Sequence, residues 1–572
     1  MKKLFATFLC VLLLLSVVLA VSACDDKGVT TDELVVYNSA DYIYDTELTD
    51  FKEYYRAVTG KNIKITYVTY DTNETMLTKI EKGDSVVDVV CPSEYAIQKL
   101  LEGGHLVKLN YFDEDLYTDG FNFAGYEHFS GQIDTNIIDM VEAAFGNLQI
   151  KDEQGNLTED KITDYFVPYM YGTLGILYNK QEFKRLGIYD KDVINKANWG
   201  ILFNDDGSGN ILSEGLTGNI LMKDSIRDSY AITLFYLKES GKLDGLTSPD
   251  GKTYTDMPVS ELINVADSQV LDICREVLTE QKKQLFGYEV DFGKDDLLMG
   301  NAIVDLAWSG DAMYAVDESW DDYLCPKCVS QTGEKQGTDI ICSECGAVCG
   351  DYELSYYVPH SAGNIWFDGW VIPDTYDPSH LTAIKLFINF LNNPEVAIQN
   401  ILEIGYSAAV SPEAIRQVIE DDDELKGELS EAYLVNSDYW EKVDEDGKQI
   451  EKFKFNSWQE FEEFFFDYRN EMDNSNWRYP FLIDVNGNGV YDRALNTLGV
   501  MRDFGENNKA VVTMWNKARS TGVNALPLLG YTVLAVAVVV GIIVLCEYLK
   551  YLKKTVVKIP KSETDGSASP KD

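Results

Sequence analysis

A regular alternation of strand-like and helix-like segments near the N-terminus most constrains the fold of this chain. Short apolar or alternating runs predict strands, and apolar residues spaced three and four apart predict the helices between them. The expected order is strand 34–37, helix 45–58, strand 63–70, a helix closed by Gly83, strand 86–90 and a helix from Ser93 to Gly103. A β-α-β-α-β-α order indicates a parallel sheet covered by helices on both faces, which is an α/β fold.

The topology of such a sheet marks where a ligand would bind. In open parallel sheets, ligands lie beyond the carboxyl ends of the strands. Two segments follow the first and third predicted strands, namely Asn38 to Tyr42 and Ser93 to Tyr95. They are therefore candidate ligand-binding segments, although ordinary loop and helix-capping residues would produce the same pattern.

A strand-like segment much later in the chain carries the strongest chemical signal. Residues 364–373 read Asn-Ile-Trp-Phe-Asp-Gly-Trp-Val-Ile-Pro, with Asp368 among three aromatic side chains. A carboxylate beside aromatic faces attracts an alkylammonium ion, because the negative charge and the ring quadrupoles act together. The alternative is an edge strand whose Asp368 faces water.

The net charge of the 572-residue chain, -45, supports a cationic ligand. An acidic surface speeds the capture of a cation and argues against nucleic acid as a partner, since phosphate contacts need an excess of Lys and Arg. Solubility outside the cell would also explain much of this excess.

Six short motifs occur in the order and spacing of one known family. They are Tyr37-Asn38, Tyr70-Asp-Thr-Asn-Glu-Thr-Met76, Val89-Val-Cys-Pro-Ser-Glu-Tyr95, Val167-Pro-Tyr-Met-Tyr-Gly172, Trp366-Phe-Asp368 and Ile404-Gly-Tyr406. The chain resembles the periplasmic spermidine/putrescine-binding proteins of polyamine ABC importers over residues 33–110 and 165–415. The resemblance implies a two-lobed, periplasmic-binding-protein-like (type II) α/β fold that closes on a polyamine through a hinge.

The resemblance also implies a set of ligand-binding residues. Carboxylates would hold the amines, and aromatic side chains would pack beside the methylene segments. The implied set is Tyr42, Ser93, Glu94, Tyr95, Asp228, Trp308, Trp366, Asp368 and Tyr406. Three positions depart from the family, since Ser39 and Ala40 replace Trp and Thr, and Ser225 replaces a second carboxylate. These departures leave open which polyamine or other compact cation binds.

Both ends of the chain carry membrane signals. Residues 1–23 resemble a lipoprotein signal peptide ending in Val-Ser-Ala before Cys24, the predicted site of lipidation. Ala525 to Cys546 is an uncharged run long enough to cross a bilayer, which predicts a transmembrane helix over 525–547, and lysines follow it. The basic tail 548–572 is then expected in the cytoplasm and the rest on the outer face of the membrane. Ordinary signal cleavage and a buried core helix are the alternatives.

The expected organisation follows from these segments. A tether at 24–31 precedes the first lobe at 32–165, and the second lobe occupies 166–365 with an insertion at 322–352. The chain returns to the first lobe at 366–410 and completes the second lobe at 411–518, which reads as mostly helical. Residues 111–165 read as irregular surface excursions.

The insertion at 322–352 contains two Cys-x-x-Cys pairs. Cys325 and Cys328 are separated by thirteen residues from Cys342 and Cys345, and Cys349 lies beyond. This spacing resembles a zinc ribbon, in which four thiolates bind one Zn²⁺. Disulfides are the alternative outside the cell, but Cys-x-x-Cys pairs form strained, exchangeable disulfides and good chelates.

A second candidate metal segment lies near the C-terminus. Asp484 to Asp492 matches the first part of an acidic calcium loop. Position twelve is Leu495 where such a loop needs Glu, which favours a turn-rich surface loop without bound calcium.

The predicted function is capture of a polyamine outside the cell and its delivery to an ABC permease with a separate ATPase chain. No catalytic signature or phosphate-binding glycine loop occurs in the sequence, so no enzymatic activity is expected. The alternative is a membrane-anchored sensor that uses the same fold for another small cation, although only a short tail follows the predicted membrane helix.

Overall fold

The computed structural model describes nine stretches of the chain. They are residues 30–152, 155–188, 199–321, 333–336, 339–342, 348–349, 354–359, 361–433 and 498–520. Residues 1–515 form one compact unit, which contains both sheets. The predicted signal peptide, the membrane segment 525–547 and the calcium loop Asp484–Asp492 lie outside the described residues. Within the described part of the chain, no helix is long and apolar enough to cross a membrane.

The first sheet has the parallel arrangement that the sequence predicts. Strands β1 (Thr31–Ser39), β2 (Asn62–Tyr70) and β3 (Val89–Val90) lie in the order β2-β1-β3, and β1 is parallel to both neighbours. β3 is shorter than the expected strand 86–90, because Val86 is exposed and the Asp88 carboxylate accepts a hydrogen bond from the Val35 amide, 2.7 Å away.

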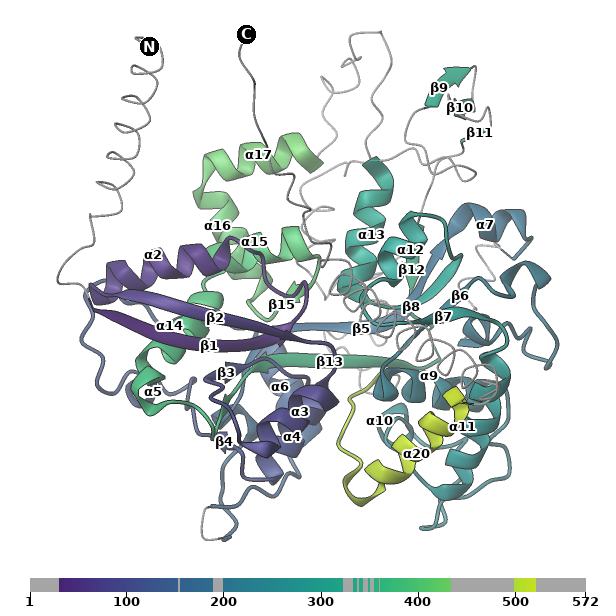
Figure 1. The fold of residues 1–572 in the computed structure, drawn as a ribbon, viewed down its shortest axis with the longest axis horizontal. Helices are drawn as coiled ribbons and strands as arrows, with labels where there is room; N and C mark the ends of the chain where they lie inside the picture. Colours follow the sequence, from purple (N-terminus) through teal and green to yellow (C-terminus); the bar gives the residue numbers. More distant parts are fainter. Residues whose placement is uncertain are drawn as a thin grey trace, which may run out of the picture. The chain divides into compact units, whose positions relative to one another are not determined.

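Three helices alternate with these strands. They are α2 (Glu47–Thr59), α3 (Asn73–Lys82) and α4 (Glu94–Glu102). α2 lies on one side of the β1–β2 ribbon, and α3 and α4 lie on the other (Figure 1). α2 ends at Gly60, whose φ of 72° suits glycine, and the Thr72 hydroxyl caps α3 by accepting the Thr75 amide at 3.3 Å. We call this sheet and its helices the first lobe.

The second sheet is mixed and larger. Its strand order is β16 (Leu498–Gly499), β13 (Gly363–Trp370), β5 (Val167–Asn179), β8 (Val304–Trp308), β6 (Ile220–Lys223) and β7 (Leu285–Glu289), while β12 (Leu354–Tyr357) and β15 (Ser407–Ala408) pair with β5. β6 is parallel to β7 and β8. We call β6, β7 and β8 and the helices packed on them the second lobe.

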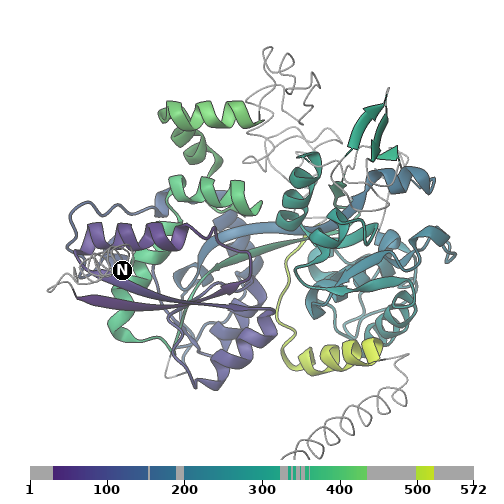
Figure 2. The same ribbon diagram turned by 45° about the horizontal axis from the view of Figure 1, so that its top comes forward.

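β5 and β13 connect the two lobes. β5 is buried along its whole length and pairs with β13 through Val167–Thr173 and with β8 through Leu174–Tyr178. At the other side of β13, Asp368 forms a bridge with Ser93 of the first lobe, and Val371 forms one with Val90. The two antiparallel strands run side by side between the lobes (Figures 1 and 2).

Further helices cover both lobes. The first-lobe side contains α5 (Glu114–Tyr117), α6 (Thr135–Phe145), α14 (Leu381–Leu391), α15 (Pro394–Ile404), α16 (Pro412–Asp421) and α17 (Asp423–Tyr433). The second-lobe side contains α7 (Lys180–Arg185), α9 (Ile226–Glu239), α10 (Val259–Leu262), α11 (Ser268–Gln281), α12 (Gly293–Leu298), α13 (Ser309–Asp321) and α20 (Asn508–Ser520). A short pair, β4 (Leu106–Val107) and β14 (Ile372–Pro373), extends the first lobe.

The expectation of an irregular chain over 111–165 is wrong at helices α5 and α6, of which α6 is the longer. Helix α6 forms there because Asp134 caps it by accepting the Asn136 amide at 2.8 Å, and because Ile137, Val141 and Phe145 bury one face. Their spacing of four residues is a helical signal that the sequence carries.

The insertion at 322–352 is described only in part. β9 (Gly333–Gln336), β10 (Asp339–Cys342) and β11 (Val348–Cys349) form a three-stranded antiparallel sheet in the order β11-β10-β9. Cys342 is the last residue of β10, whereas Cys325, Cys328 and Cys345 lie outside the described residues. The zinc ribbon therefore stays a prediction, and so do the lobe boundaries.

Candidate functional site

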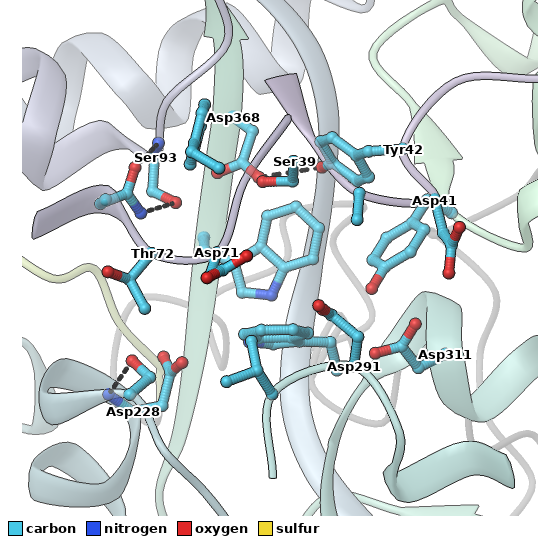
Figure 3. Close-up of a pocket in the computed structure, with 18 of the residues that line it drawn as sticks. Ser39, Asp41, Tyr42, Asp71, Thr72, Ser93, Asp228, Asp291, Asp311 and Asp368 are labelled. Carbon is cyan, nitrogen blue, oxygen red and sulfur yellow. Dashed lines mark hydrogen bonds between the residues drawn. The ribbon is translucent and has the colours of Figure 1, made fainter. Parts of the chain in front are cut away.

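One pocket between the lobes contains every ligand-binding residue predicted from the sequence. The pocket is lined by Tyr42, Ser93, Glu94, Tyr95, Asp228, Trp308, Trp366, Asp368 and Tyr406, together with residues that the sequence did not identify. Figure 3 labels Tyr42, Ser93, Asp228 and Asp368 among them. The segments Ser39–Tyr42 and Ser93–Tyr95 lie at the carboxyl ends of β1 and β3, as topology predicts. That these nine residues bind a ligand is still a prediction.

Asp368 has the environment that the sequence suggested. It lies at an irregularity of β13, where the pairing with β5 shifts between Asp368 and Gly369. Its Oδ2 accepts a hydrogen bond from the Tyr42 hydroxyl at 2.9 Å. Its Oδ1 is shielded from solvent and has no partner among the described residues. A shielded carboxylate oxygen without a donor is costly, so the fold keeps an unsatisfied acceptor at the wall of the pocket.

Burial raises the pKa of Asp368 to about 7, although hydrogen bonds from Ser93 and Tyr42 oppose the shift and nearby Asp228 adds to it. Ligand-free Asp368 is therefore partly protonated at neutral pH. A cation beside it would favour the charged form and restore a lower pKa.

Tyr42 is held in place by hydrogen bonds from side chains of β1 and β5. Its carbonyl accepts the Asn38 amide at 3.3 Å and the Tyr169 hydroxyl of β5 at 3.1 Å. The Tyr42 ring packs edge-on against Tyr406, with 4.9 Å between ring centroids. Tyr406 also lies 5.7 Å from the ring of Trp366. Asp368 is thus held beside a rigid aromatic wall.

Glu94 and Ser93 begin helix α4. Glu94 Oε2 accepts the Phe367 amide of β13 at 3.1 Å, while Oε1 is buried and has no partner in the described part of the chain. Burial, with a contribution from Asp368, raises the pKa of Glu94 to about 8. Ser93 exchanges hydrogen bonds with the Asn73 side chain, through Oγ at 3.0 Å and its amide at 3.3 Å. Glu94 is therefore an acidic group of the pocket that ties α4 to β13.

Asp228 reaches the pocket from the second lobe. It lies in the first turn of α9, where the Ser225 hydroxyl caps the helix by accepting the Asp228 amide at 3.4 Å. Burial raises the pKa of Asp228 to about 6, a smaller shift than that of Asp368. Asp228 lies in the second lobe and Asp368 lies on the connecting strand β13, and the charge of Asp228 adds to the raised pKa of Asp368.

Trp308 differs from its expected role in one respect. It ends β8 and lines the pocket, but the buried Lys223 ammonium lies 4.1 Å from its ring centroid. Lys223 is paired with Glu289 at 2.6 Å. A cation–π contact of this kind leaves the opposite ring face for a ligand.

Sequence reasoning missed several charged residues of the pocket. They are Asp41, Asp71, Glu74, Asp291, Asp311 and Lys294. Asp71 and Glu74 follow β2, and the topology argument applied to the first and third strands would have found them. Asp41, Asp291, Asp311 and Lys294 come together only through the tertiary fold. The three departures from the family, Ser39, Ala40 and Ser225, also line the pocket.

The charge balance of the pocket favours a cation. Its described lining contains eight carboxylates, Asp41, Asp71, Glu74, Glu94, Asp228, Asp291, Asp311 and Asp368, and one lysine, Lys294. Aromatic walls accompany these carboxylates. The pocket thus combines the two features that an organic polycation needs.

Comparisons with known proteins confirm the resemblance predicted from the motifs. Residues 42–206 match the family model of the bacterial extracellular solute-binding protein. The putrescine-binding periplasmic protein SpuD of Pseudomonas aeruginosa is 23% identical over 424 residues, covering 74% of this chain and 89% of the relative. The spermidine/putrescine-binding periplasmic protein of Escherichia coli is 23% identical over 374 residues, covering 65% and 76%.

A solved structure shows the same fold. The chain described as a spermidine/putrescine ABC transporter from Listeria monocytogenes aligns with a TM-score of 0.50 and 22% identity, covering 85% of this chain and 99% of its own. The periplasmic-binding-protein-like α/β fold expected from the sequence is thereby confirmed. The two sequence relatives are named for binding, as expected for a protein that is not an enzyme.

Proposed function

We propose that this protein captures a polyamine outside the cell in the pocket between its lobes and delivers it to an ABC permease that works with a separate ATPase. The observation that carries the proposal is the Asp368 carboxylate. Its Oδ1 is shielded and unpartnered among the described residues, and it lies beside Tyr42, Trp366 and Tyr406. An ammonium group satisfies this oxygen, and methylene groups pack on the adjacent rings.

Ligand binding would act through closure of the lobes. Asp368 and Ser93 meet at the junction of β13 with the first lobe, whereas Asp228 and Trp308 belong to the second lobe. A polyamine that contacts both sets stabilises the closed state more than the open one, and so shifts the population toward closure. The permease would then recognise the closed form.

The relatives' names support an extracellular or periplasmic location. We propose in addition that lipid on Cys24 and a helix at 525–547 hold the protein on the outer face of the cytoplasmic membrane. Both tethers rest on the sequence signals alone. Mass spectrometry of the mature N-terminus tests the first tether, and protease protection of the basic tail in sealed vesicles tests the second.

The insertion would bind one structural Zn²⁺ through Cys325, Cys328, Cys342 and Cys345. The three short antiparallel strands β9, β10 and β11 lie between and beyond the two Cys-x-x-Cys pairs, which suits a ribbon that presents turns to a metal. A zinc site here is structural and has no role in the pocket. A calcium site at Asp484–Asp492 has weaker support, because Leu495 replaces the expected final ligand.

Isothermal titration calorimetry of the purified full-length chain tests the proposed function. Putrescine, spermidine and spermine are titrated separately, with 1,4-butanediol as an uncharged control of putrescine's length. Micromolar or tighter binding of at least one amine, with no heat from the diol, supports the proposal. The absence of binding by all three amines would refute polyamine capture while leaving the fold unaffected.

A further inference from the structure

The pocket contains a cation of its own. Lys294 in helix α12 has its Nζ 3.2 Å from Asp311 Oδ1 and 3.5 Å from Asp41 Oδ2. Its side chain is 12% exposed, and its ammonium lies 5.6 Å from the ring centroid of Tyr314. Carboxylates and an aromatic ring around one ammonium are the surroundings that a polyamine amine requires.

The two carboxylates hold Lys294 unequally. Asp311 in α13 is 9% exposed, so its attraction is little screened by water. Asp41 lies on the loop after β1 and is 72% exposed, so its pair with Lys294 is weak. Asp311 therefore holds the Lys294 ammonium in place, and Asp41 of the first lobe contributes a second, weaker contact.

The position of Lys294 determines which carboxylates of the pocket remain free to bind a ligand amine. Asp41 and Asp311 lie at one end of the pocket, on the right of Figure 3, whereas Asp368 and Asp228 lie toward the left, at the top and the bottom of the view. Lys294 pairs with Asp41 and Asp311 at the first end. Asp228 and Asp368 are then the two facing carboxylates that remain to bind the amines of a ligand. Among the remaining acids, Glu74 already accepts the Tyr95 hydroxyl at 3.2 Å, Glu94 accepts the Phe367 amide at 3.1 Å, and Asp71 is exposed. Asp291 also lines the pocket, and burial raises the pKa of its carboxyl group, which favours the uncharged form.

We propose that Lys294 occupies the place of a third ligand ammonium, and that it makes the pocket select a diamine over a triamine. The inference rests on the proposed function. A diamine places its two ammonium groups at Asp368 and Asp228. A triamine of greater length must either bring its third ammonium against that of Lys294 or leave it outside the pocket. Like charges at close range in a poorly hydrated site repel strongly, so Lys294 acts as a specificity-determining residue.

Calorimetry with putrescine and spermidine tests this inference on the full-length protein. Lys294→Met removes the charge at similar side-chain length, Lys294→Arg retains the charge, and Lys252→Met removes a lysine from the exposed Lys252–Glu261 pair outside the pocket. We expect the wild-type protein to bind putrescine roughly tenfold or more tightly than spermidine, since one lost ammonium contact changes affinity by that order.

The variants should separate charge from side-chain volume. Lys294→Met should improve spermidine binding relative to putrescine by roughly tenfold, whereas Lys294→Arg and Lys252→Met should keep the wild-type ratio. Circular dichroism and thermal unfolding check folding. If Lys294→Met does not fold, Lys294→Gln serves instead, because its amide can still donate to Asp311.

Each failure has its own signature. A wild-type protein that binds neither amine contradicts the proposed function itself. A wild-type protein that binds spermidine as tightly as putrescine, or a folded Lys294→Met or Lys294→Gln protein with an unchanged ratio, overturns the role of Lys294 while polyamine binding stands.

Discussion

Replacing Asp368 by Asn tests the centre of the proposed site. The substitution keeps the shape of the side chain and an oxygen that can accept the Tyr42 hydroxyl, now 2.9 Å from Oδ2. It removes the negative charge and converts one oxygen to an amide that cannot accept a hydrogen bond from an ammonium. Asp228→Asn is the matched variant at the other end of the pocket.

The size of the expected effect follows from the environment. Opposite unit charges about 3 Å apart attract by about 5–6 kcal/mol at an effective dielectric constant of 20. Desolvation cancels much of this, and hydrogen bonds to charged groups contribute about 1.5–3 kcal/mol net. Because the pKa of Asp368 is about 7, ionising it at pH 7 subtracts only about 0.4 kcal/mol. A loss of about 2 kcal/mol corresponds to roughly 30-fold weaker binding.

The assay is calorimetric titration at pH 7.5 of the wild-type, Asp368→Asn and Asp228→Asn proteins with the tightest-binding amine. We expect Asp228→Asn to lose less, because the Ser225 hydroxyl and the positive charges of Lys223 and Arg227 already offset part of the cost of burying Asp228, so less of its attraction is left for an amine. Equal and small losses in both variants would refute the proposed pocket.

Thermal unfolding of ligand-free protein controls for misfolding. Burial raises the pKa of Asp368, so the folded state binds more protons than the unfolded state between about pH 4 and pH 7. Stability contributed by this residue therefore falls as pH rises through that window. Asp368→Asn should then be at least as stable as wild type above pH 7, which separates loss of binding from loss of fold.

Three further predictions concern other parts of the protein. Amine affinity should fall below pH 7, by up to about tenfold per pH unit for each carboxyl group that must lose its proton, because Asp368 and Asp228 have pKa values of about 7 and 6. Calorimetry in buffers of different ionisation enthalpy should detect the released protons, and a pH-independent affinity from pH 5.5 to 8 would contradict this. Gly310→Ala should weaken binding roughly tenfold without changing any charge, because the added Cβ would collide with the Tyr406 ring; Gly427→Ala, where the new methyl group meets nothing, is the control. Protein purified under reducing conditions should contain one zinc ion per chain by elemental analysis, and the double variant Cys325→Ser, Cys328→Ser should contain none. Metal-free wild-type protein whose disulfides are detected by mass spectrometry would show that the insertion is cross-linked instead.

The sequence predicted those features that depend on local pattern. The parallel first sheet followed from alternating periodicity and glycine stops, and Asp368 was identifiable because a lone acid interrupts an aromatic strand. The end of α3 was recognisable because Gly83 follows its apolar pattern. Each of these signals lies within about ten residues of chain.

Features that depend on distant parts of the chain were not predicted. Asp41, Lys294 and Asp311 meet at one end of the pocket, yet they come from two lobes and no repeat or motif links them. The contact of Lys223 with Trp308 is of the same kind, since the predicted stacking residue already packs against a lysine of a neighbouring strand. Only the tertiary fold brings such charges together.

Strand β13 has a consequence for how the ligand preference of this protein can evolve. Asp368 lies on the strand that pairs with β5 and bridges to Ser93, so a substitution near it alters the joint between the lobes as well as the pocket. The segment from the end of β1 to Asp41 and the segment from Asp291 to the start of α12 contribute side chains to the same pocket without belonging to that joint. New ligands should therefore be acquired by mutation of these two segments, while β13 and its acid are inherited unchanged.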